Sequence, residues 1–166
     1  LEVAAGDTRV PTFVPDGSIT DAQIAPGISP TKIALEGIKF YRSTTQTIGT
    51  AADTAITFDT VVFNRGFQNP GASFTTVTIP RNGIYVIVAD MTWDNDSTGG
   101  RTLRMMVNGT QINEATMQAN GTSGNSLSAI RRLTSGDTLG IQVRQSSGVN
   151  RTIAGTENTG GVGVIF

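Results

Sequence analysis

The sequence predicts an all-β domain, an antiparallel sandwich or barrel of about ten strands, preceded by an extended N-terminal segment. From residue 38 onward, short runs rich in β-branched and aromatic residues recur roughly every 8–12 residues, a spacing typical of sandwiches and barrels. Polar turns rich in Gly, Asn, Ser and Thr separate these runs, and the chain contains 20 glycines. Few stretches carry the residues that favour helices.

The central pair of runs is Phe74–Ile79 and Ile84–Trp93, on either side of the turn Pro80-Arg81-Asn82-Gly83. Pro80 cannot donate to a sheet hydrogen bond, so the first strand is expected to end there. Gly83 provides the permissive backbone at which the second begins. The second run is apolar at most positions rather than at alternate ones. This pattern predicts a strand that is buried on both faces inside the sandwich.

The other strands are predicted on the same grounds, as apolar or β-branched runs between polar turns. In chain order they are Ile38–Ser43, Thr45–Ile48, Ala55–Phe58, Val61–Asn64, Thr102–Val107, Gln111–Met117, Ser126–Leu133, Thr138–Gln145 and Val162–Phe166. Asn108-Gly109 predicts a type I′ hairpin, because both central residues of that turn need a positive φ. The segment Ser146–Gly161 is predicted to be a polar loop.

A short internal repeat precedes the strands, in which ITDAQIAPG (19–27) aligns with ISPTKIALE (28–36). Its prolines exclude a continuous helix. A single extended chain cannot bury the isoleucines Ile19, Ile24, Ile28 and Ile33, whereas three chains around one axis can, at roughly 1.5–3 kcal/mol for each fully buried side chain. The alternative is a flexible linker. The repeat resembles the ITDAQIA-type segments of bacteriophage fibre stalks, so residues 1–36 are expected to form an attachment and stalk segment and residues 37–166 a head domain.

Composition argues against an enzyme. The chain has no cysteine and no histidine, which removes thiolate nucleophiles, the Ser-His-Asp triad and the usual metal ligands. A carboxylate pair for glycoside hydrolysis stays open, but no pair is set by local spacing. The net charge of −1 with scattered basic residues disfavours nucleic acid binding. No apolar run approaches the roughly 20 residues that span a bilayer. We expect no catalytic residue and no cofactor.

Several motifs appear in the order found in one family. They are ITFDTVVFN (56–64), Phe74, Ile79-Pro80, Gly83, Tyr85, LRMMVNG (103–109), SLSAIRRLTSGDTLGIQV (126–143) and GVGVIF (161–166). The segment from Ile56 to Phe166 thus resembles the globular head of complement component one, subcomponent q, among the tumour necrosis factor-like (TNF-like) jelly rolls. The resemblance implies a jelly-roll sandwich, a C-terminal strand inside a sheet, and a homotrimer.

The apolar content agrees with a trimer, because large side chains exceed what one small sandwich core needs. The alternative is that all of them are core. The candidate residues for a trimer interface are Ile19, Ile24, Ile28, Ile33, Tyr41, Met91, Trp93, Met105 and Phe166.

Two further groups are candidate sites. Asp94 and Asp96 supply hard oxygen ligands in one turn and are candidates for calcium, with turn formation as the alternative. Arg131 and Arg132 lie in a predicted strand, where one of them can pair with a carboxylate of another subunit or both can be solvated. The polar loops are candidates for sugar recognition or for inert tips. They are Gly66–Gly71, Asn95–Gly100, Gln118–Asn125 and Ser146–Gly160.

The favoured hypothesis is a non-enzymatic, trimeric bacteriophage fibre, spike or capsid decoration protein on the virion surface. Its N-terminal segment would attach to a capsid or tail protein, and its head would bind host-surface carbohydrate. The alternative is a secreted TNF-like recognition module that acts as a lectin or a signalling ligand. A glycan hydrolase is the third hypothesis, which the missing His and Cys disfavour.

Overall fold

A computed structural model of the chain describes residues 36–153, 155 and 161–165. The predicted stalk, with Ile19, Ile24, Ile28 and Ile33, lies outside the described residues, as does Phe166. The domain boundary at residue 37 therefore stays a prediction from sequence.

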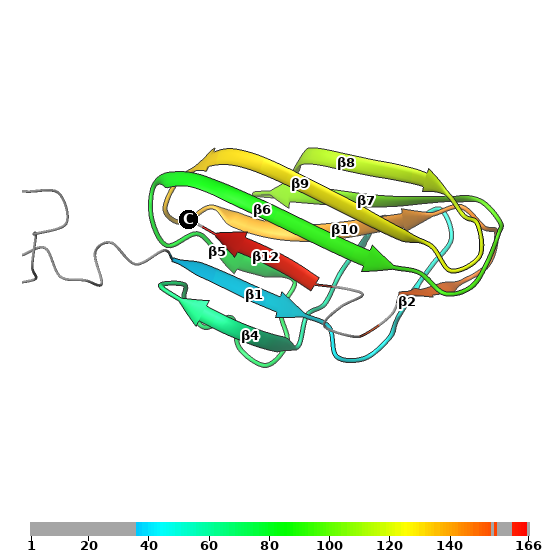
Figure 1. Ribbon diagram of the computed structural model, residues 1–166, viewed down its shortest axis with the longest axis horizontal. Helices are drawn as coiled ribbons and strands as arrows, with labels where there is room; N and C mark the ends of the chain where they lie inside the picture. The colour runs from blue at the N-terminus through cyan, green and yellow to red at the C-terminus, as the bar shows by residue number, and fades with distance from the viewer. Residues whose placement is uncertain (1–35, 154, 156–160, 166) are drawn as a thin grey trace, which may run out of the picture. The chain divides into compact units, whose positions relative to one another are not determined.

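The described elements are all β-strands, as predicted (Figure 1). They are β1 (Gly37–Tyr41), β2 (Gln46–Ile48), β3 (Thr54–Ala55), β4 (Thr60–Arg65), β5 (Thr76–Thr78), β6 (Gly83–Thr92), β7 (Gly100–Val107), β8 (Thr110–Gln118), β9 (Gly124–Leu133), β10 (Thr138–Gln145), β11 (Arg151–Ile153) and β12 (Gly161–Ile165). No helix in the described part of the chain is long and apolar enough to cross a membrane.

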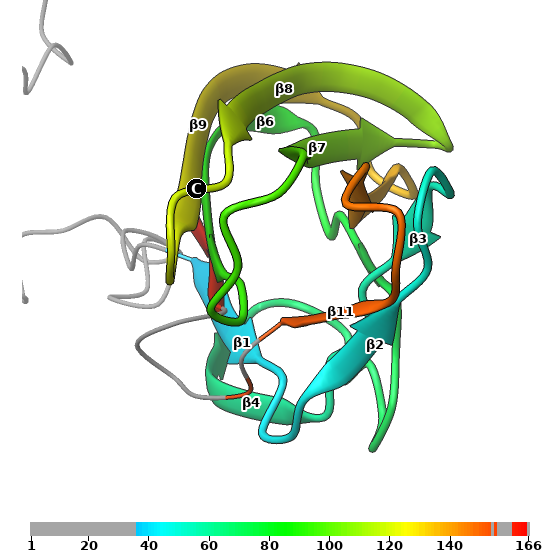
Figure 2. The same cartoon turned by 90° about the vertical axis from the view of Figure 1, so that its right-hand side faces the viewer.

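The strands form two five-stranded sheets and a small two-stranded one. The first sheet has the order β4-β1-β12-β6-β9, seen from bottom to top in Figure 1. The second sheet has the order β3-β10-β7-β8, with β5 also paired to β10, and it lies on the other side of the interior (Figure 2). β11 pairs with β2. Strand β12 lies between β1 and β6, which confirms that the C-terminal strand is inside a sheet.

The hairpin between β7 and β8 forms as predicted. Asn108 and Gly109 have φ values of 50° and 75°, the left-handed pair that a type I′ turn needs. The Asn108 side chain donates to Asp137 at 2.8 Å and accepts from the backbone N–H of Thr138 at 2.8 Å, which ties this turn to the next one.

Some strands are shorter than predicted, and one was missed. Phe58 and Phe74 pair only with each other, as an isolated bridge with N–H···O distances of 2.7 and 2.9 Å, so β3 and β5 are short. β11 lies inside the predicted polar loop. Its pairing with β2 depends on residues about a hundred positions away, which a local pattern does not register.

Aromatic and aliphatic side chains fill the space between the sheets. The ring of Phe40 meets those of Phe58 and Phe74 edge-on, at centroid distances of 4.7 and 5.2 Å. Met91, Trp93 and Met105 are also core residues, each at most 2% exposed. The single chain already buries these three, so their assignment to a trimer interface is corrected, and for them the core alternative holds. Tyr41, at the end of β1, is partly exposed.

Strand β6 is buried on one face only. Tyr85, Ile87, Ala89 and Met91 point inward, whereas the alternate residues are exposed to solvent. The prediction of burial on both faces is therefore wrong for the single chain. The outward side chains of β6 are nevertheless mostly apolar, so their exposure to solvent needs an explanation.

Candidate functional site

The outward face of the first sheet carries a group of exposed apolar side chains, which we call the apolar face. It consists of Val62 and Phe63 on β4, Ile84, Val86 and Val88 on β6, and Ile130 on β9, each 39–70% exposed. Among the side chains of residues 36–153 and 155, the only other exposed large apolar one is Val149. Exposed apolar side chains that gather on one face usually mark an interaction surface.

Strand register brings these residues together. Val86 lies directly opposite Ile130, and the next pair on the same face is Val88 and Ser128. Such cross-strand neighbours have Cβ atoms about 4.5–5.5 Å apart, so their side chains pack into one surface. Gly163 of β12 pairs with Val88 on one side and with Lys39 of β1 on the other.

The β4 edge reaches the same surface through a register shift. Phe63 pairs with Lys39 and Val61 with Phe40, so Val62 is an extra residue at this irregularity. Val62 and Phe63 are both 43% exposed, although strict alternation would turn one of them inward.

Charged and hydrogen-bonding groups limit the apolar face at its two ends. Arg132 lies opposite Ile84 at one end. At the other end Ser126 lies opposite Asp90 and donates a hydrogen bond to its carboxylate. An apolar centre with a polar rim is the usual composition of a protein interface.

The predicted calcium ligands have other partners. Asp96 accepts a hydrogen bond from Arg101 at 2.6 Å and pairs with Arg151 at 2.8 Å. Asp94 accepts from the backbone N–H of Thr152 at 3.1 Å. The two carboxylates thus connect the end of β6 to β7 and β11, and calcium binding by this turn stays a prediction from sequence. In the described residues no three acidic, His or Cys side chains form a group that could hold a metal ion.

Arg101 is the buried centre of this cluster. Its side chain is 0% exposed, although it is cationic, and its guanidinium lies 5.3 Å from the centroid of the Trp93 ring. The Trp93 indole N–H donates to Asn125 at 2.9 Å. Burial raises the pKa of Asp96, but the hydrogen bond from Arg101 and other interactions outweigh burial, so that this pKa lies below its usual value.

Arg131 and Arg132 are both exposed. Arg131 donates to the backbone carbonyl of Ile112 in β8 at 2.9 Å, so one of the two is used within the chain to bridge the sheets. Pairing of Arg132 with another subunit stays a prediction.

Sequence reasoning missed the apolar face, although its signal was visible. The run Ile84–Trp93 is apolar at both sets of alternate positions, and Val61–Phe63 is apolar three times in a row. Both patterns indicate burial beyond what one sandwich provides.

Neither a protein-family model nor a curated protein sequence matches the chain. Solved structures do. Eiger TNF from S. frugiperda is similar with a TM-score of 0.60 at 11% identity, over 79% of this chain and 91% of that one. Murine APRIL at pH 8.0 is similar with a TM-score of 0.60 at 13% identity, over 80% of this chain and 98% of that one. Likeness at such low identity concerns the backbone arrangement, and on that ground the head of this chain has the TNF-like jelly-roll fold.

Proposed function

We propose that this chain is a non-enzymatic, TNF-like recognition module whose heads associate as a homotrimer through the apolar face. The observation that carries the proposal is the exposure of Val86 and Val88 on β6 and of Ile130 on the neighbouring edge strand β9. Leaving such side chains in water forfeits roughly 25 cal/mol for each Å² of apolar surface that a partner would cover.

Other copies of this chain are the partner that best fits the apolar face. The β6 sequence is apolar on both alternations, so the strand is composed for burial on two sides, and the single chain supplies only one. A copy of the same chain is always available to cover the second side, and closed rotational symmetry covers it in every subunit. The TNF-like fold supports three copies, because domains of this fold are typically homotrimers.

The recognition role follows from what the head lacks and what its fold supports. The absence of His and Cys removes the Ser-His and Cys-His nucleophile–base pairs. The similar structures are a TNF protein and APRIL, which supports a recognition module over the bacteriophage fibre. The fibre hypothesis depends on the repeat at residues 19–36, outside the described residues. Virion attachment and a capsid or tail partner stay predictions from sequence.

Analytical ultracentrifugation of the full chain tests the proposal. We expect a species of three times the 17.4 kDa chain mass. Val86→Asp would place a carboxylate in the proposed interface, where burying an unpaired charge is costly. We expect this variant to dissociate at concentrations at least about a hundredfold higher than the unmodified chain.

Val149→Asp is the matched control, because Val149 is 54% exposed but lies in the loop between β10 and β11, away from the apolar face. It should sediment as the unmodified chain does. A monomer for the unmodified chain at micromolar concentration would refute the trimer. A V86D variant that remains fully trimeric would show that the subunits meet elsewhere.

A further inference from the structure

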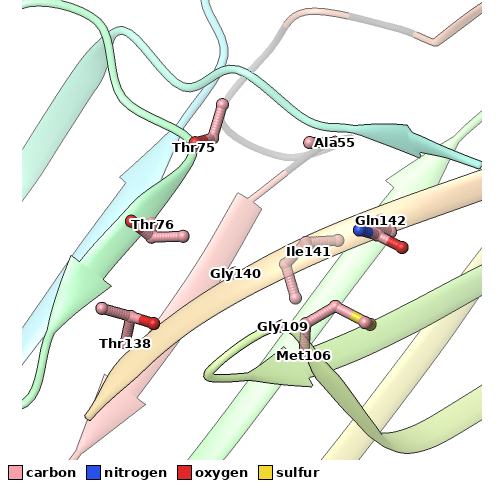
Figure 3. Close-up of a pocket in the computed structure, with 9 residues that line it drawn as sticks. All are labelled: Ala55, Thr75, Thr76, Met106, Gly109, Thr138, Gly140, Ile141 and Gln142. Atoms are coloured by element: carbon pink, nitrogen blue, oxygen red, sulfur yellow. The ribbon is translucent and has the colours of Figure 1, made fainter.

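The second sheet has a hollow on its outward face, which is lined in part by Gly140 of β10. Gly140 of β10 lies in register between Thr76 of β5 and Met106 of β7. Strand β5 approaches this glycine closely, since a Cβ on Gly140 would lie 3.0 Å from the backbone carbonyl oxygen of Thr75 and 3.1 Å from the Thr76 methyl carbon. The cavity beside it has a volume of about 90 Å³, with Thr138 and Gln142 as further walls (Figure 3).

A second hollow adjoins the first. It has a volume of about 220 Å³ and is lined by Gln68, Asn69, Pro70, Thr76 and Thr78. Thr76 lines both hollows, and we call the two together the track across β5. Part of the track comes from the loop Gly66–Gly71, one of the segments considered for sugar recognition from the sequence.

Several polar side chains along the track make no hydrogen bond within the described residues, although the Thr138 hydroxyl donates to Asn108 at 3.3 Å. Within the described residues, Gln68, Thr76, Thr78 and Gln142 make no side-chain hydrogen bond, and Asn69 uses only its carbonyl oxygen, which accepts from Gly71 at 3.1 Å. Other polar residues nearby are occupied: Asn108 donates to Asp137. Hydroxyl and amide groups both donate and accept, so the track offers a line of unused donors and acceptors.

The lining also restricts the charge of a ligand. Neither hollow contains an Asp, Glu, Lys or Arg side chain. A charged ligand group would lose water there without gaining a counter-charge. Pro70, Ala55 and Met106 contribute apolar surface beside the polar groups. A neutral ligand with many hydroxyl groups and apolar C–H surface matches this combination.

We propose that the track across β5 binds a neutral oligosaccharide, with one sugar unit in each hollow and Thr76 hydrogen-bonded between them. The inference deepens the proposed recognition function by naming a ligand class. The track belongs to the second sheet and the apolar face to the first, so sugar binding and subunit association use different surfaces.

The test uses the full chain and a panel of neutral oligosaccharides: oligomers of glucose, mannose and N-acetylglucosamine, with their monosaccharides and sulfated counterparts. Titrations followed by amide NMR should shift the signals of Thr76, Gly140 and Gln142 with at least one neutral oligomer. That oligomer should bind at least about tenfold more tightly than its monosaccharide, because it fills two hollows. The sulfated form should bind more weakly.

Thr76→Val removes the shared hydroxyl and keeps the side-chain shape and β-propensity. Losing one or two neutral hydrogen bonds should weaken binding about three- to tenfold. Thr110→Val is the matched control: Thr110 is also an exposed strand threonine of the second sheet, but it lines neither hollow. It should bind as the unmodified chain does.

The ligand assignment is overturned if no neutral oligomer of the panel binds at millimolar concentration, if only sulfated sugars bind, or if T76V and T110V bind equally well. Sedimentation of the same samples separates the two proposals. A trimer without sugar binding overturns the track alone, whereas sugar binding by a monomer overturns the subunit interface alone.

Discussion

Replacing Arg101 by Met tests whether the buried cation at the end of β6 stabilises the head. The Arg101 side chain is 0% exposed and donates to Asp96 at 2.6 Å and to the carbonyl of Thr98 at 3.0 Å. Methionine keeps an unbranched apolar stem of similar length but removes the guanidinium and its contact with Trp93.

The expected magnitude follows from what is left behind. Removing one partner of a buried ion pair costs about 3–5 kcal/mol, because the other charge stays buried without it. Asp96 keeps Arg151 at 2.8 Å, so the low end applies, and we expect a loss of about 3 kcal/mol. For a domain of this size that loss lowers the melting temperature by about 10 °C.

Arg104→Met is the control on the same strand. Arg104 also binds two carboxylates, Glu114 at 2.6 Å and Asp53 at 2.5 Å, but it points outward and its side chain is 18% exposed. Surface ion pairs contribute about 0–1 kcal/mol, so this variant should lose at most about 1 kcal/mol.

Urea denaturation at equal protein concentration measures both variants, since a trimer makes stability concentration-dependent. If R101M loses no more free energy of unfolding than R104M, burial of Arg101 does not make its ion pair with Asp96 more stabilising than the more exposed ion pairs of Arg104. That result would refute the expected loss of about 3 kcal/mol.

Two other perturbations have definite expected outcomes. The pKa values of Asp59, Asp96 and Asp137 lie below their usual value, so the unfolded chain binds more protons in acid. Since the chain has no histidine, we expect the free energy of unfolding in urea to stay nearly level from about pH 5 to 8 and to fall as the pH drops below about 4; a rise below pH 4 would contradict these shifts. Gly99→Ala would put a Cβ 2.5 Å from the backbone carbonyl of Ser146, and we expect a loss above about 2 kcal/mol in the same assay. Gly109→Ala shares the φ of 75° but has nothing within 4 Å, so it should lose only about 1 kcal/mol of backbone strain, and equal losses would refute the close approach at Gly99.

Local signals were enough to predict most strands and the type of fold. β-Branched runs gave β1, β6 and β10 within one or two residues, and Asn108-Gly109 specified its turn by backbone geometry alone. These features depend on neighbours within a few positions, so a short stretch of sequence is enough to predict them.

The sites could not be predicted in the same way. Asp96 was recognised as a loop carboxylate, but its partner Arg151 comes from another strand, and Arg101 occupies an inward position that a charge would not be expected to take. The track across β5 exists because strand register brings Gly140 beside Thr76. Neither contact can be predicted from the spacing of residues that are near in sequence.

By itself, therefore, the sequence determined where strands and turns lie and that β6 is apolar on both alternations. Only the tertiary structure decided which alternation is core. It places Tyr85, Ile87 and Met91 inside and leaves Val86 and Val88 in solvent. The physical reason is that alternation along a strand shows which residues share a face. It does not show on which face the second sheet packs, because that depends on contacts between residues far apart in the chain.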